Sequence, residues 1–90
     1  MDSEGFVRAV EERLVPIAPI IGYAIKKQLH DIGADRRSLT PELSLLFIDR
    51  MVSALDLFLG QKGAKEAKHL MLKELRRFAP EYFEKLEGLG

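Results

Sequence analysis

The chain has 90 residues, with 14 Lys and Arg against 14 Asp and Glu, and it contains no cysteine. This length fits a single domain, 1–90, and the lack of cysteine excludes a disulfide framework, thiol catalysis and cysteine-ligated zinc. A formal net charge of zero provides no overall field toward nucleic acid or an anionic membrane, and the low self-repulsion favours association.

The composition also bears on where the protein works. The first five residues carry acids in place of the basic start of a signal peptide. The longest apolar run, 17–25, is too short to span a bilayer. We therefore expect a cytoplasmic protein with no membrane association. The chain has no Asn, only two Gln and 31% charged residues, a composition that favours a thermophilic source.

Two helices are predicted in the first third of the chain. Apolar residues recur at helical spacing over 3–15 and again over 16–32. Ser3 is the predicted N-cap of the first helix. Pro16 and Pro19 lie between the two segments. They either kink one long helix or separate two, because proline disfavours helical geometry before it and is accepted in a first turn.

Two long helices and a short one are predicted beyond a charged loop at 34–39. The Thr-Pro-Glu sequence at 40–42 combines a cap, a proline at the first helical position and an acid near the positive end of the helix dipole. Gly60 is the predicted end of that helix. The next helix spans 64–79, and Pro80 restarts the chain as a short last helix.

The helix before Gly60 is apolar around most of its girth, which is typical of a central helix or of one that contacts two neighbours. A chain of this size has few residues with which to cover both apolar faces, and exposed patches usually mark interfaces. We therefore predict a homodimer, with a monomeric helical protein as the alternative. The predicted association face is Leu45, Ile48, Val52, Leu55 and Leu59.

The segment 62–77 is basic and offers an alternative function. Its cationic side chains could contact phosphates, with an affinity that falls steeply as salt rises. No aromatic residue lies among them to stack on a base, so nucleic acid is the less favoured partner, and a solvated helix face explains the same pattern. The candidate residues are Lys62, Lys65, Lys68, Lys73, Arg76 and Arg77.

No residue pattern predicts catalysis, and we expect neither enzymatic activity nor a cofactor. Glu66 and His69 form one Glu-x-x-His pair, a spacing used by di-iron helical proteins, but such a site needs two pairs and two further glutamates. His30 is not spaced from a Ser or Cys nucleophile as in a known catalytic motif, and it is interpreted as a surface histidine. We therefore predict no metal site.

One stretch of sequence resembles a known group of domains. Leu-Val-Pro-Ile-Ala-Pro-Ile-Ile at 14–21, Ile-Gly at 32–33 and Leu-Thr-Pro-Glu-Leu at 39–43 are similar to small helical accessory domains of bacterial and archaeal signalling proteins. Val15 stands where those domains have a glycine, and the similarity covers 14–59. The resemblance implies a signalling accessory or interaction module, with a partner supplied in trans and no catalytic residues.

Taken together, these features predict an all-α fold, a bundle of four to five helices. The favoured function is a small helical protein-interaction module that is homo-oligomeric and serves as a signalling accessory. Its partners would be a second copy of itself or another protein.

Overall fold

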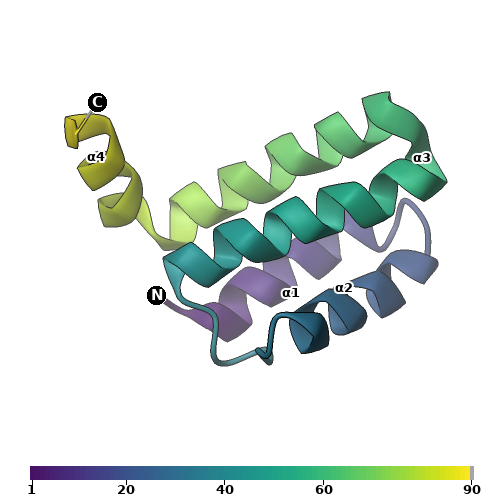
Figure 1. Ribbon diagram of the computed structural model, residues 1–90, viewed down its shortest axis with the longest axis horizontal. Helices are drawn as coiled ribbons and strands as arrows, with labels where there is room; N and C mark the ends of the chain where they lie inside the picture. The colour runs from purple at the N-terminus through teal and green to yellow at the C-terminus, as the bar shows by residue number, and fades with distance from the viewer. Residues whose placement is uncertain (90) are drawn as a thin grey trace.

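A computed structural model describes residues 1–89 of the chain. Within this range the structure is helical and contains no strand, so the all-α prediction is confirmed. Figure 1 shows α1, α2 and a long, sharply bent α3 lying side by side, with α4 projecting from one end. The four helices are α1 (Ser3–Leu14), α2 (Ile20–Asp31), α3 (Pro41–Phe78) and α4 (Pro80–Leu89).

The start of α1 differs from the predicted one. Asp2, and not Ser3, is the N-cap, and its carboxylate accepts a hydrogen bond from the Gly5 backbone N at 2.9 Å. Ser3 is buried, and its Oγ donates to the Arg36 carbonyl at 2.8 Å and accepts from the Leu39 backbone N at 2.9 Å. A side chain predicted to act locally therefore joins α1 to the distant loop before α3.

The prolines between the first two helices separate them. A turn closes after α1, with the Ile17 backbone N donating to the Leu14 carbonyl at 3.0 Å. α2 then starts at Ile20, directly after Pro19, without a side-chain cap. After α2, Gly33 has a φ of 71°, which is the left-handed conformation that glycine adopts at helix ends without steric cost.

α3 is a helical hairpin. Thr40 caps its start by accepting a hydrogen bond from the Leu43 backbone N at 3.1 Å, with proline in the first turn, as predicted. Gly60 interrupts the helix with φ 72° and ψ 175°, a conformation that is essentially restricted to glycine. The first arm (41–59) and the second arm (61–78) run back along each other in Figure 1.

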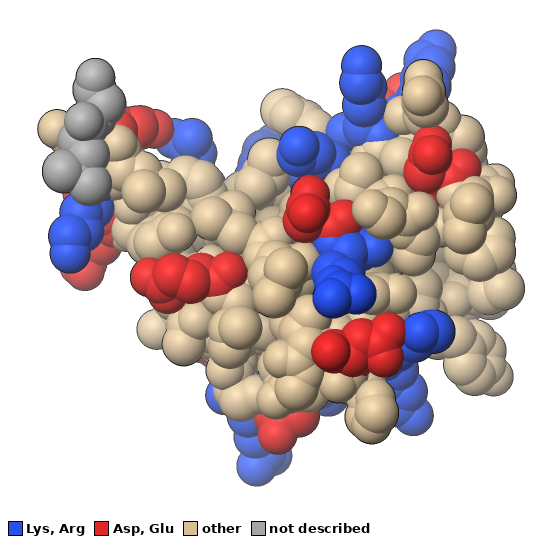
Figure 2. Space-filling model, viewed as in Figure 1, with Lys and Arg blue, Asp and Glu red and all other residues tan. Residues whose placement is uncertain are grey.

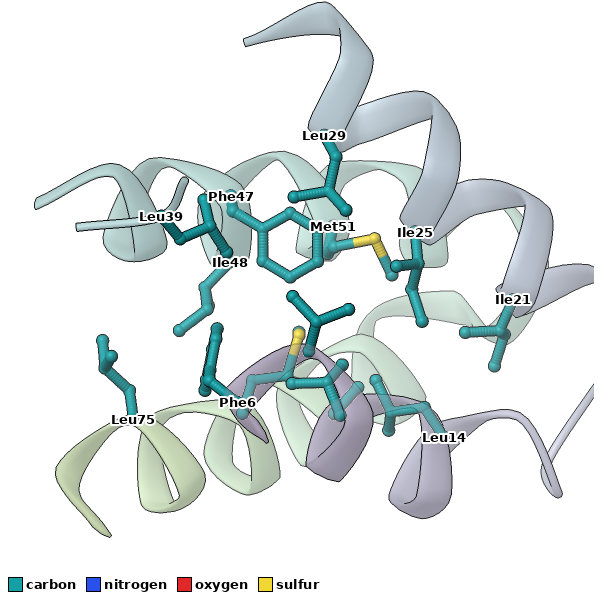
Figure 3. Packing of buried hydrophobic residues seen from close by; sticks show 14 of the residues in the cluster. Phe6, Leu14, Ile21, Ile25, Leu29, Leu39, Phe47, Ile48, Met51 and Leu75 are labelled. Carbon is teal, nitrogen blue, oxygen red and sulfur yellow. The ribbon is translucent and has the colours of Figure 1, made fainter. Parts of the chain in front are cut away.

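The core is a single hydrophobic cluster to which α1, α2 and both arms of α3 contribute side chains, as Figure 3 shows. At its centre the ring of Phe6 makes edge-to-face contacts with Phe47 and Phe78, at centroid distances of 6.4 and 6.3 Å. Gly5 allows this close approach, because a Cβ at that position would lie 2.8 Å from Cε1 of Phe78. The labelled core residues are Phe6, Leu14, Ile21, Ile25, Leu29, Leu39, Phe47, Ile48, Met51 and Leu75.

Candidate protein-interaction surface

The residues of the predicted association face are buried or partly buried within the single chain. The exposed fractions of Ile48 and Leu55 are 2% and 0%, while the other three members are partly buried and pack against the core: Leu45, Val52 and Leu59. The bend at Gly60 folds the second arm back along the first, and Lys68 and Leu72 of the second arm line one hollow with Leu45 and Ile48. Ile48 and Leu55 therefore have almost no exposed area to offer a partner, whereas Leu45, Val52 and Leu59 remain partly exposed.

A different apolar cluster is exposed. Leu57 is 83% exposed and Phe58 is 53% exposed on the first arm of α3, and Tyr23 is 77% exposed and Ile20 47% exposed on α2. All four line one groove of about 530 Å³ between these two elements. We call these four residues the α2–α3 face. Contiguous exposed apolar patches commonly occur at interaction surfaces of proteins.

Sequence reasoning missed this cluster. Leu57 lies outside the predicted association face and follows the polar residues Arg50 and Ser53 by seven and four positions. Residues seven apart share a helix face, so this spacing was the available signal. No sequence pattern predicts the exposure of Tyr23, because that exposure depends on how α2 packs against its neighbours.

The groove of the α2–α3 face has an apolar end and a charged end. At the charged end, Lys27 Nζ lies 2.8 Å from Asp31 Oδ2. The hydrogen bond from Lys27 lowers the pKa of Asp31 below its ordinary value of 3.8. Arg50 also lines this end and has no ion-pair partner among residues 1–89. The rim thus carries both signs of charge.

A second hollow, of about 510 Å³, lies on the other side of Tyr23, and we call it the α1–α2 hollow. Its polar wall includes an ion pair in which the Arg36 guanidinium donates to both carboxylate oxygens of Glu11, at 2.7 and 2.9 Å. This bidentate contact raises the pKa of Arg36 and fixes both side chains. The apolar lining comes from Pro19, Gly22, Ile25, Leu29 and Ala34.

The six predicted phosphate-contacting residues are all exposed, but they are not equivalent. Arg76 pairs with Glu87 at 2.9 Å and its guanidinium lies 4.9 Å from the centre of the Phe83 ring. Arg77 lies 3.2 Å from Glu74. Among residues 1–89 the other four have no ion-pair partner: Lys62, Lys65, Lys68 and Lys73. On the face in Figure 2, basic and acidic side chains are interspersed.

The Glu-x-x-His pair and the remaining histidine lie on the surface. Glu66 and His69 are exposed, as is His30. Across residues 1–89, no three His, Cys, Asp or Glu side chains come together as a metal site would require. Glu74, on the same arm of α3, is buried, with an exposed fraction of 3%.

Comparison of the chain with protein-family models, with curated proteins and with solved structures gives no match. None of the helices within the described range has the length and apolar character needed to cross a membrane.

Proposed function

We propose that the protein is an interaction module that self-associates through the α2–α3 face. The observation that supports this proposal is the exposure of Leu57 and Tyr23, 83% and 77% respectively, beside one groove. Burying apolar surface yields about 25 cal/mol per Å² removed from water, so two copies that cover these side chains gain free energy at each one. Tyrosine is among the residues that most often dominate the binding energy of a protein interface.

The charge of the chain favours a second copy over a charged partner. The net charge is zero, and the groove rim carries Lys27, Asp31 and Arg50. A surface with both signs of charge can be complementary to itself, whereas a strongly acidic or basic partner would leave one sign opposed by like charge. In this proposal the homodimer serves as a signalling accessory, the role implied by the resemblance at 14–59.

Replacing one exposed leucine tests the proposal. Leu57→Asp introduces a charge at the centre of the α2–α3 face, and we expect the solution mass to fall from dimer to monomer while the helical circular dichroism is unchanged. Leu86→Asp is the matched control, since Leu86 is also exposed, at 44%, but lies on α4. A Leu57→Asp variant that remains dimeric would place the interface elsewhere. Ile48→Asp is unsuitable, because burying a charge there disrupts the fold.

The four lysines without ion-pair partners support a second candidate, binding of a polyanion along the second arm. Their cationic groups are exposed on one helix, and phosphate contacts from such groups depend strongly on salt. A titration of random duplex DNA at low and moderate salt tests it, with Lys65→Glu as the charge-reversal variant. The candidate predicts binding at low salt that salt and Lys65→Glu both weaken. An absence of binding at low salt would eliminate it.

A further inference from the structure

Tyr23 is a projecting side chain between two hollows. It lines both the α2–α3 groove and the α1–α2 hollow, and 77% of it is exposed. An aromatic ring in this position leaves a large apolar area in water. Tyrosine commonly serves as an anchor in protein interfaces because its ring is apolar and its hydroxyl remains able to hydrogen-bond.

The α1–α2 hollow has the chemical character that such a ring needs. Its apolar lining includes Ile25 and Leu29, and its rim carries polar groups that can meet a phenol hydroxyl. Gly22 keeps the hollow open, because it has no side chain and a Cβ there would meet only Cγ2 of Val15, at 4.0 Å. An apolar base with a polar edge matches the two ends of a tyrosine side chain.

The rim of the hollow is electrically balanced. Two acids, Glu11 and Asp35, and two bases, Lys26 and Arg36, line it, so these charges sum to zero. Glu11 and Arg36 neutralise each other directly. Because these rim charges sum to zero, they give a charged side chain no overall attraction to offset its lost hydration, whereas a neutral aromatic group has no charge to desolvate.

We infer that two copies pair about a two-fold axis beside α2, so that Tyr23 of each copy fills the α1–α2 hollow of the other. The inference rests on the proposed self-association and specifies its geometry. A two-fold contact requires a surface patch that is complementary to itself. Tyr23 lies at the edge of the hollow, so the ring and the hollow belong to one surface patch. A single two-fold rotation therefore places each ring in the hollow of the other copy.

A tryptophan reporter tests this geometry directly, because the chain contains no tryptophan. In Tyr23→Trp, the only tryptophan should shift its emission to shorter wavelength over the same concentration range in which light scattering shows the mass to double. In the control, Leu86→Trp, the emission should not change with concentration. A mass that doubles with no change at position 23 would overturn the inference and would place the self-association on a surface that does not include Tyr23. A monomer at all concentrations in the unmodified chain would overturn both.

A second variant covers the case in which the larger indole ring alters association. Gly22→Leu places a side chain inside the hollow and replaces glycine with a good helix former, so the monomer should remain folded. The inference predicts a dimer dissociation constant raised about tenfold or more, since the filled hollow clashes with the incoming ring. An unchanged dissociation constant in Gly22→Leu would contradict the placement of Tyr23 in the α1–α2 hollow and would leave self-association through the α2–α3 face intact.

Discussion

Arg13 Nε lies 3.2 Å from Glu74 Oε1 and connects α1 to the second arm of α3. The Glu74 side chain is 5% exposed, whereas that of Arg13 is 50% exposed. The other carboxylate oxygen is buried without a hydrogen bond, although Arg77 Nη2 lies 3.2 Å away without the alignment that a hydrogen bond needs. Arg13 therefore supplies the only side-chain hydrogen bond that Glu74 receives within the described chain.

Arg13→Ala should destabilise the fold by about 1–3 kcal/mol, because it leaves a buried carboxylate without its hydrogen-bond donor. The double variant Arg13→Ala/Glu74→Leu should recover part of this loss, since an apolar side chain has no buried charge to satisfy. Urea unfolding of the three chains measures both effects. A double variant less stable than Arg13→Ala alone would show that Glu74 contributes through contacts other than this pair.

Ser3→Ala should reduce the free energy of unfolding by about 2 kcal/mol, because two buried backbone groups lose their side-chain partner. Those groups are the Arg36 carbonyl and the Leu39 N–H. Ser53→Ala is the matched control: Ser53 is exposed, and its replacement should change stability by no more than about 0.5 kcal/mol. Equal effects of the two substitutions in thermal or urea unfolding would rule out the proposed connection.

Gly60→Ala should destabilise the hairpin of α3 by about 1–3 kcal/mol, because the φ of 72° and ψ of 175° at Gly60 are strained for any residue with a Cβ. Gly88→Ala provides the comparison. Gly88 lies in α4, and a Cβ there would meet nothing within 4 Å, so alanine should be neutral or slightly stabilising. If Gly60→Ala matches Gly88→Ala in urea unfolding, the bend does not depend on glycine.

Local chemistry explains which parts of the fold could be predicted. The Thr40 cap and the stop at Gly60 are properties of a few neighbouring residues, and the structure confirms both. The first N-cap was wrong by one residue because Asp2 and Ser3 are both good caps. The choice between them depends on the loop at 36–39, to which Ser3 bonds, and that contact joins residues 33 and 36 positions apart in the sequence.

The candidate site was harder to predict for the same reason. The first arm of α3 has two apolar faces, and no local pattern determines which one the second arm covers. Ile48 and Leu55 on one face and Phe47 and Met51 on the other are all buried, so the exposed apolar surface lies with Leu57 and Tyr23 instead. Tertiary packing thus decides which apolar residues remain available to a partner.

The most direct measurement is the solution mass of the unmodified chain by light scattering, at about 10 µM and again at tenfold dilution, a range that spans micromolar dissociation constants. Self-association through the α2–α3 face predicts a mass twice the 10.2 kDa of the chain at the higher concentration, with Leu57→Asp at the monomer mass. A mass of one chain at both concentrations would contradict the proposal that this protein acts by pairing with a second copy of itself.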